Sequence, residues 1–291
     1  MEWKASKHDC GQGRLRMRIM TQLFSKLQSL EKSLTEMHSV LVAYSGGTDS
    51  TFLLKVASNV LVDKVIAVTA SSETYTPKEL EEARTTAVII GAKHIIVQTN
   101  ELDNLSFASN PPDRCYYCKT ELFTKLFAVA KEHGLNYVID GSNCDDERDF
   151  RPGMRAAAEF HVRSPLREAG LTKEEIRALS KEMNLPTWDK PPLPCLSTRF
   201  PYGTLITREK ITRVARAEKF LADLGIRQLR VRDHDTIARI EVPRVNMPMF
   251  LDEEICQKIT EKFRTLGYAY VTLDIQGYRM GSMNETLIET R

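Results

Sequence analysis

The chain has 291 residues, of which 42% are hydrophobic and 27% are charged, and its formal net charge is +2. The composition excludes a wholly disordered or collagen-like chain, and the length suits two domains. The nearly balanced charge argues against nucleic acid as a partner, and no apolar run is long enough to span a membrane. The polar, basic N-terminus has no secretion signal, so we expect a cytoplasmic protein whose cysteines act as thiols or ligands rather than disulfides.

Strand and helix patterns alternate along the first two thirds of the chain. Residues 1–18 are expected to form a disordered tail, and leucines at helical spacing predict a helix over 20–38. The predicted strands are 40–44, 64–70, 94–99 and 136–141, and the predicted helices follow them at 51–61, 77–90, 120–134 and 172–185. Alternation of this kind predicts an α/β domain with a doubly wound parallel sheet over residues 19–203.

The pattern changes after a proline-rich stretch. KPPLPCLSTRFPYG over residues 190–203 predicts an ordered loop or a domain linker. Further predicted elements are helices at 208–225 and 253–267, a strand pair at 228–242 and a strand at 268–275. We therefore expect a smaller α+β domain over residues 204–291, which would serve substrate binding or oligomerisation.

The strongest chemical signal lies between the first predicted strand and its helix. It consists of Ser45, Gly46, Gly47, Thr48, Asp49 and Ser50. Glycines let the backbone approach a ligand closely, and the amides of the loop and of the helix start form an anion cradle. A carboxylate beside phosphates requires a cation, so Asp49 is expected to hold Mg²⁺. The structural alternative is a Gly-Gly turn in which Asp49 caps the helix.

This loop resembles the pyrophosphate loop of the N-type ATP pyrophosphatases. The resemblance implies that Ser45–Ser50 bind ATP, which is cleaved between its α and β phosphates while an acceptor oxygen is adenylated.

Three cysteines outside the tail form a second signal. Cys115 and Cys118 are a CxxC pair whose sulfurs can reach one metal ion or cluster, although a redox pair or two incidental cysteines would look the same. Cys195 lies in the proline-rich loop, where it is either a functional thiol or a packing residue. A structural zinc site needs a fourth ligand, such as Cys144 or a histidine. A [4Fe–4S] cluster on three cysteines would instead keep one iron open to bind sulfur, which suits sulfur transfer.

Charged residues give weaker signals. Asp145 and Asp146 follow a predicted strand and either hold a metal, orient an arginine or form a solvated loop. Arg230 and Arg232 share one face of a predicted strand, and Arg199 is a further candidate. Paired guanidinium groups suit phosphate or carboxylate recognition, although an exposed charged strand face is an equal alternative.

Taken together, the motifs resemble the LarE family of ATP-dependent sulfur transferases from about residue 22 onward. The resemblance rests on AYSGGTDSTFLLKVA, RCYYCK, DGSNCDDERDFRPGMRAA, CLSTRFPYGTLIT, LRVRDHDTIARIEV and YVTLDIQGYRMGSMNETL. It implies the adenine-nucleotide α-hydrolase fold and a role in making the nickel-pincer nucleotide of lactate racemase. In that reaction, ATP adenylates a carboxylate of a pyridinium biscarboxylate mononucleotide, and sulfur then replaces an oxygen. The family's contacts to substrate phosphate and metal correspond to Arg199, Glu218, Arg230 and Arg232.

The family uses two sulfur sources. Some members give up the sulfur of a single cysteine, and others hold a [4Fe–4S] cluster on three cysteines and turn over repeatedly. The presence of Cys115, Cys118 and Cys195 favours the cluster type, with Cys195 as a sacrificial donor in the alternative.

The resemblance also implies partners. These are other copies of the chain in a homo-oligomer, an upstream sulfur donor and a downstream nickel-insertion protein. Two further alternatives are a tRNA thiolase of the same superfamily, disfavoured by the small net charge, and a non-catalytic nucleotide- or metal-binding regulator, disfavoured by Asp49.

Overall fold

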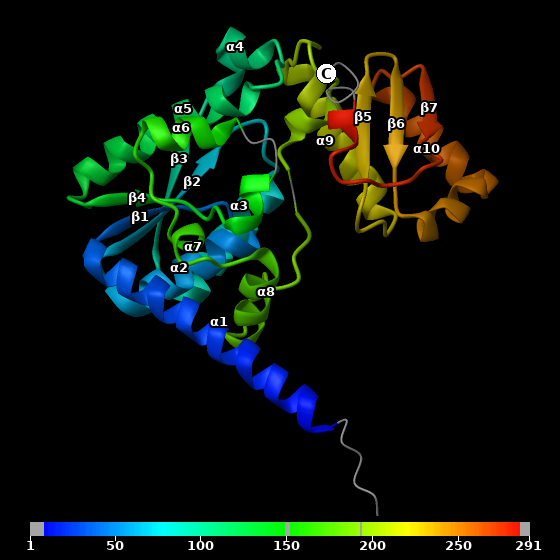
Figure 1. Cartoon of the computed structure of the whole chain (residues 1–291). Coiled ribbons are helices and arrows are strands. Elements are labelled where there is room, and N and C mark those ends of the chain that lie inside the picture. The colour runs from blue at the N-terminus through cyan, green and yellow to red at the C-terminus, as the bar shows by residue number, and fades with distance from the viewer. Residues whose placement is uncertain (1–8, 149–151, 193, 286–291) are drawn as a thin grey trace, which may run out of the picture.

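The computed structural model describes residues 9–148, 152–192 and 194–285, which form an α/β domain and a smaller α+β domain (Figure 1). The α/β domain contains α1 (Asp9–Met37), β1 (Val40–Ala43), α2 (Thr48–Leu61), β2 (Val65–Ser71), α3 (Pro77–Ile90), β3 (Lys93–Gln98), α4 (Leu105–Ala108), α5 (Arg114–Glu132), β4 (Tyr137–Ile139), α6 (Gly153–Glu159), α7 (Pro165–Glu168) and α8 (Lys173–Glu182). The smaller domain contains α9 (Arg208–Asp223), β5 (Arg230–His234), β6 (Ile237–Glu241), α10 (Glu253–Thr265) and β7 (Tyr270–Leu273).

The sheet of the first domain is parallel and has the strand order β3-β2-β1-β4. An isolated parallel bridge between Ile139 and Arg163 extends it beyond β4. Because all strands run in one direction, their carboxyl ends meet at one edge, where ligands of open α/β sheets bind. The predicted α/β class is confirmed.

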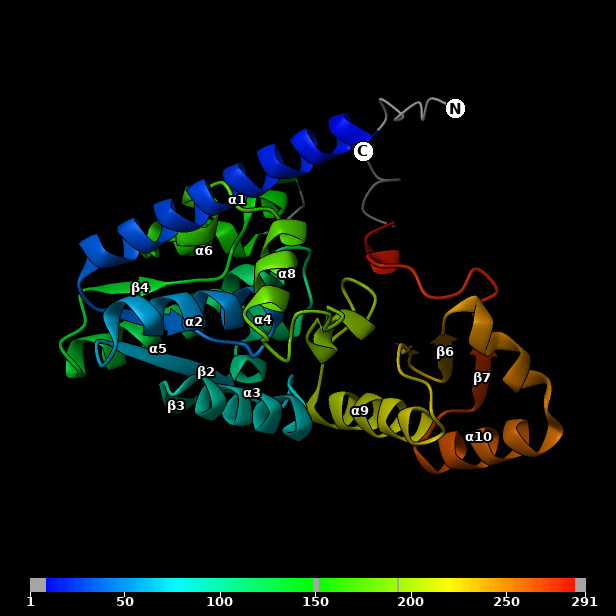
Figure 2. The ribbon, with the colours of Figure 1, turned by 90° about the horizontal axis from the view of Figure 1, so that it is seen from below.

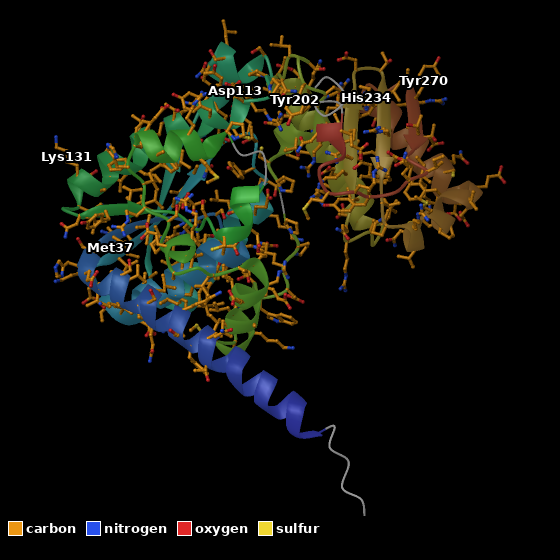
Figure 3. The ribbon with its side chains drawn as sticks, viewed as in Figure 1. Met37, Asp113, Lys131, Tyr202, His234 and Tyr270 are labelled. Carbon is orange, nitrogen blue, oxygen red and sulfur yellow. The ribbon has the colours of Figure 1, made fainter. Side chains whose placement is uncertain are left out.

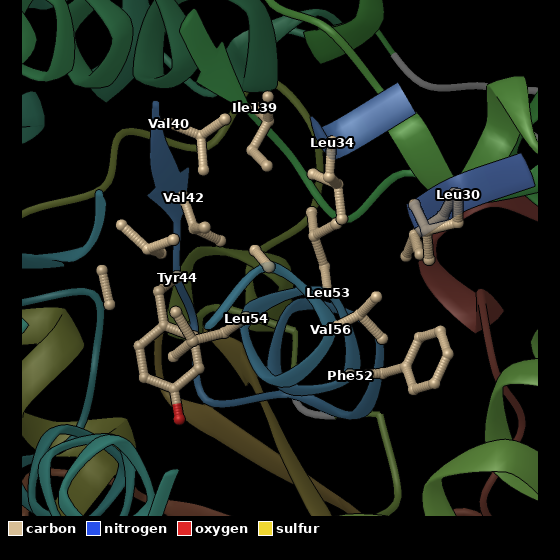
Figure 4. Packing of buried hydrophobic residues seen from close by; sticks show 14 of the residues in the cluster. Leu30, Leu34, Val40, Val42, Tyr44, Phe52, Leu53, Leu54, Val56 and Ile139 are labelled. Carbon is tan, nitrogen blue, oxygen red and sulfur yellow. The ribbon is translucent and has the colours of Figure 1, made fainter. Parts of the chain in front are cut away.

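Helices cover both faces of this sheet. Val40 and Val42 of β1 point to the face covered by α1 and α2, where Leu34 and Leu53 pack against them (Figure 4). The intervening Leu41 points to the opposite face, which α5 and α6 cover. Each fully buried side chain of this size contributes about 1.5–3 kcal/mol, so the alternation in β1 fixes its place at the centre of the sheet.

Three helices begin earlier than predicted, among them α2, which begins at Thr48 rather than at residue 51. α1 extends back to Asp9, so residues 9–18 are helical rather than part of a disordered tail, and residues 1–8 lie outside the described residues. Once a helix is formed, each added residue gains a backbone hydrogen bond, so extension does not require an apolar stripe. α5 begins at Arg114, directly after the turn at Pro111 and Pro112, and therefore contains both cysteines of the CxxC pair.

The smaller domain pairs β5 with β6 in antiparallel and β6 with β7 in parallel orientation. α9 and α10 lie along the same side of this sheet (Figure 2), and Phe263 and Tyr268 fill the core between them and Val231 and Ile240. None of the helices in the described part of the chain is both long and apolar enough to cross a membrane.

Candidate functional site

The loop Ser45–Ser50 connects the carboxyl end of β1 to the first turn of α2. Gly46 has a φ of +69°, and a Cβ on it would lie 2.8 Å from the Cβ of Ala83 in α3. Gly47 is the N-cap of α2 and supplies no side-chain cap, so the first amides of this helix remain available to an anion. The geometry is that of a phosphate cradle.

The hydroxyl groups of the loop have different roles. Ser45 Oγ and Ser50 Oγ lie 3.1 Å apart, and the amide of Ser45 donates to Ser50 Oγ. Both can turn toward a ligand. Thr48 is different, because its buried hydroxyl donates to the carbonyl of Thr187 at 2.8 Å and ties the loop to the segment after α8.

The Gly46→Ala variant is expected to lose ATP binding while the fold persists. The added methyl group would collide with Ala83, and the left-handed backbone at this position disfavours any side chain. We expect the dissociation constant for ATP, measured by isothermal titration calorimetry, to rise at least ten-fold. Gly134→Ala is the matched control, since it also has a positive φ but no heavy atom within 4 Å of the new Cβ. Unchanged ATP affinity in Gly46→Ala would contradict the cradle.

Asp49 faces a lysine that the sequence did not indicate. Its Oδ2 accepts from Lys173 Nζ at 2.5 Å, whereas its Oδ1 is buried without a hydrogen-bond partner among the described residues. An orphaned carboxylate oxygen beside a phosphate cradle fits a Mg²⁺ ligand. Lys173 is held by its own backbone amide, which donates to Asp145 Oδ2 at 2.8 Å. Asp145 thus positions the lysine, while residues 149–151 of the family-like stretch DGSNCDDERDFRPGMRAA lie outside the described residues.

The sequence marks the start of the helix that carries Lys173, although not the role of this lysine. Thr172 and Glu175 form the capping box that starts α8, and both of its hydrogen bonds are observed. The box places Lys173 at the first helical position, directly beside the edge where β1 ends. What the sequence could not show is that this helix start faces Asp49.

A cavity of about 210 Å³ opens beside the loop, at the carboxyl ends of β1 and β2. Its walls include Ser45, Ser72, Tyr75, Glu79 and Lys119. Apolar walls with a few polar groups next to a phosphate cradle suit the base and sugar of a nucleotide.

Cys118 lies near both other candidate cysteines, at a place we call the cysteine corner (Cys115, Cys118 and Cys195). Cys118 packs in the same hydrophobic cluster as Leu196, the neighbour of Cys195. Burial, with smaller effects from Glu101, Cys195 and Cys115, raises the pKa of the Cys118 thiol. Burial also raises the pKa of Tyr75, and Cys118 and Cys195 add to the effect. Tyr75 therefore lies beside both the cavity and these two thiols.

The cysteine corner has the donor chemistry of an iron–sulfur site. No group of three or more His, Cys, Asp or Glu side chains in the described part of the chain is arranged to hold a single metal ion. A four-iron cluster makes a different demand, because its three thiolates bind three different irons and stay further apart. The cysteine corner supplies three thiols, which are the ligands that such a cluster requires. Cys144 lies elsewhere, with its thiol against the carbonyl of Arg167.

In cluster-free protein, Cys118 is expected to react slowly with iodoacetamide. Its raised pKa keeps the thiol protonated through neutral pH, and only the thiolate is nucleophilic. Cys115 is exposed and should react first. Mass spectrometry of timed digests would measure both rates, and the rate at Cys118 should rise only at strongly alkaline pH. Equal alkylation of the two residues at neutral pH would contradict the raised pKa of the partly buried Cys118 thiol.

The four residues that correspond to the family's contacts to substrate phosphate and metal lie together near Cys195. Arg199 makes a bidentate ion pair with Glu218, at 2.8 and 2.9 Å, and donates to the carbonyl of Cys195 at 3.2 Å. Glu218 also accepts from the amide of Val231. Its side chain is only 15% exposed, so it is not the surface residue that its position on an amphipathic helix suggested.

Arg230 and Arg232 lie on the same face of β5, and both are buried. Arg232 pairs with Glu241 at 2.7 Å and donates to the carbonyl of Thr198. Glu241 is fully buried and was missed by the sequence analysis, since an acidic residue at a strand end looks exposed. Burial, followed by the charge of Arg199, lowers the pKa of Arg230. The strand face is therefore a buried cationic site rather than a solvated one.

Comparisons with known proteins identify relatives of the whole chain. The chain is 48% identical to an uncharacterized protein of Synechocystis sp. over 91% of its own length and 99% of that protein. It is 41% identical to the pyridinium-3,5-bisthiocarboxylic acid mononucleotide synthase of Lactiplantibacillus plantarum, over 94% and 98% of the two chains. The glutamine-hydrolyzing GMP synthase of Chlamydia caviae is 24% identical over 62% of this chain and 38% of that protein. No family model matches the chain.

Proposed function

This chain belongs to the LarE family, and from that premise we propose that it is an ATP-dependent sulfur transferase that converts a pyridinium-3,5-biscarboxylate mononucleotide into its thiocarboxylate. The observation that carries the proposal is the adjacency of three kinds of group. The phosphate cradle and its cavity meet the cysteine corner at Tyr75, and Arg199 links Cys195 to the buried arginines. Nucleotide, sulfur and an anionic acceptor would meet there.

The first step of the proposed reaction joins the acceptor to AMP. A carboxylate oxygen of the mononucleotide attacks the α-phosphorus of ATP, the bond to the bridging oxygen breaks, and pyrophosphate leaves. The amides of Ser45–Ser50 stabilise the negative charge that develops on the leaving group. With Mg²⁺ on Asp49, the ammonium of Lys173 becomes available to the phosphates as a further positive charge.

The second step replaces oxygen with sulfur. A sulfur nucleophile adds to the acyl carbon of the adenylate, the bond from that carbon to the AMP oxygen breaks, and AMP leaves. Arg199 and Arg230 would orient the anionic acceptor, because guanidinium groups pair with phosphate and carboxylate in fixed geometry. The buried position of these arginines keeps water from competing for the adenylate.

Cys115, Cys118 and Cys195 would hold the [4Fe–4S] cluster. When bound, the cluster would supply an open iron that carries the sulfur to be transferred. In the alternative, Cys195 would give up its own sulfur once per chain. We also propose that the protein acts in the cytoplasm as a homo-oligomer, receives sulfur from a donor and passes its product to a nickel-insertion protein.

The experiment measures pyrophosphate, AMP and thiocarboxylate with the biscarboxylate mononucleotide and ATP under anaerobic conditions. We expect all three products from the unmodified protein. About four irons per chain that are lost in Cys195→Ser would support the cluster. No iron after reconstitution, together with one thiocarboxylate per chain and loss of sulfur mass at Cys195, would support the sacrificial route. ATP binding without pyrophosphate release would contradict both enzymatic proposals.

A further inference from the structure

Arg230 is a buried cation whose hydrogen-bond acceptors, among the residues that the structure describes, are all uncharged. Its guanidinium donates to the carbonyl oxygens of Leu229 and Pro192 and to the hydroxyl of Tyr278, at 2.6, 3.2 and 3.3 Å. Among the described residues, the nearby carboxylate of Glu218 is already engaged by Arg199. A buried guanidinium without a carboxylate partner favours an anionic ligand.

Tyr278 reaches this arginine because the chain reverses after β7. Asp274 accepts from the amides of Gln276 and Gly277, and the amide of Tyr278 then donates to the carbonyl of Val242. Gly277 has a φ of +80°, with Val242 O only 3.0 Å from the position of a Cβ. The turn therefore requires glycine and directs Tyr278 back toward β5.

The segment after the turn is fastened along the arginine site. Ser282 Oγ donates to Glu241 and accepts from Arg232, each at 2.9 Å. Asn284 Oδ1 accepts from the hydroxyl of Tyr202, which lies between the two domains (Figure 3). The red C-terminal segment accordingly runs back beside β5 in Figure 1. These contacts hold Tyr278 next to the substrate site proposed above.

The ring of Tyr278 already holds a cation. The Cζ atom of Arg230 lies 5.2 Å from the ring centroid, within the range of a cation–π contact. The same guanidinium donates to Pro192 in the loop that carries Cys195. A positively charged aromatic ring that entered here would find an aromatic face on one side and the sulfur-bearing loop on the other.

We propose that Tyr278 is the specificity-determining residue for the pyridinium ring of the substrate. On binding, Arg230 turns to a carboxylate or phosphate of the ligand, and the cationic ring takes the place of the guanidinium over Tyr278. A pyridinium ring bears a permanent positive charge, and the face of a tyrosine ring attracts cations. This inference rests on the proposed function, because it concerns how the same site recognises its nucleotide.

The test compares Tyr278→Phe with Tyr278→Leu. Dissociation constants for the pyridinium-3,5-biscarboxylate mononucleotide would be measured by titration calorimetry without ATP, and KM and kcat by pyrophosphate release. The Phe variant keeps the aromatic face and should bind within about two-fold of the unmodified protein, whereas the Leu variant should bind about ten-fold more weakly. In the Leu variant KM should rise while kcat stays within about two-fold, since the ring contacts the substrate away from the reacting bond.

Tyr270→Leu is the matched control, because this tyrosine lies exposed on the edge strand β7 of the same domain, away from the α/β domain (Figure 3). It should bind like the unmodified protein. Wild-type affinity in Tyr278→Leu would overturn the inference, and so would equal weakening in Tyr278→Phe, which would assign the effect to the hydroxyl. A lack of binding and of pyrophosphate release in the unmodified protein would instead overturn the proposed function.

Discussion

Asp49→Asn should lower the rate of pyrophosphate release about a thousand-fold while the protein stays folded. The amide is nearly isosteric but carries no charge to hold Mg²⁺ on the phosphates. Within the described part of the chain, one oxygen of Asp49 is buried without a hydrogen-bond partner, so the substitution removes a ligand rather than a packing group. Loss of the ion pair with Lys173 should cost about 1 kcal/mol or less, since both side chains are partly exposed.

The measurement is a steady-state assay of pyrophosphate over a range of Mg²⁺ concentrations, with circular dichroism to follow the fold. Asp63→Asn is the matched control, because Asp63 is exposed just beyond the other end of α2. It should match the unmodified protein in every assay. A rate near normal in Asp49→Asn would mean that the cation is held elsewhere, and that Asp49 serves only to fix Lys173.

Glu218→Gln should destabilise the folded protein by about 3–5 kcal/mol. The substitution breaks a buried ion pair and leaves the charge of Arg199 buried without a carboxylate partner. Arg199, Arg230 and Arg232 are buried together with the carboxylates of Glu218 and Glu241. The site thus already holds one cation more than it holds anions, and the substitution adds a second uncompensated charge. Denaturant unfolding with linear extrapolation would measure the loss.

An anion should restore part of that stability. Inorganic phosphate that binds only the folded protein stabilises it by mass action, and the doubly uncompensated site of Glu218→Gln should bind it more tightly than the unmodified site. Chloride at equal ionic strength separates specific binding from screening. Glu209→Gln, exposed in the first turn of the same helix, should cost less than about 1 kcal/mol. If Glu218→Gln and Glu209→Gln lowered the free energy of unfolding equally, the carboxylate of Glu218 would not stabilise the arginine site.

Local patterns were enough to predict the parts of the site that lie in one stretch of chain. The loop Ser45–Ser50 sits between a strand and a helix because an apolar run and a helical pattern flank it, and both are short-range properties. The capping box of Thr172 and Glu175 is equally local, because the two residues are three positions apart, and both of its hydrogen bonds are observed.

Pairings between distant residues could not be predicted in this way. Asp49 and Lys173 are 124 positions apart, and only the order of strands in the sheet brings them together. The burial of Glu218 likewise depends on how α9 packs against β5, because its helix neighbours Ala217 and Lys219 do not indicate which way its side chain faces. Resemblance pointed to Glu218, whereas Lys173 and Glu241 emerged from the structure alone.

The proline-rich loop joins the two domains and also forms hydrogen bonds with both of them. Lys190 donates to the carbonyl of Gly46, the side chain of Asn110 donates to the carbonyls of Phe200 and Pro201, and Pro192 accepts from Arg230. A connector held in this way cannot serve as a free hinge, and a protease reaches it only after one of these contacts has opened. The two domains should therefore lose their structure in one cooperative transition, in which the phosphate cradle and the arginine site disappear together.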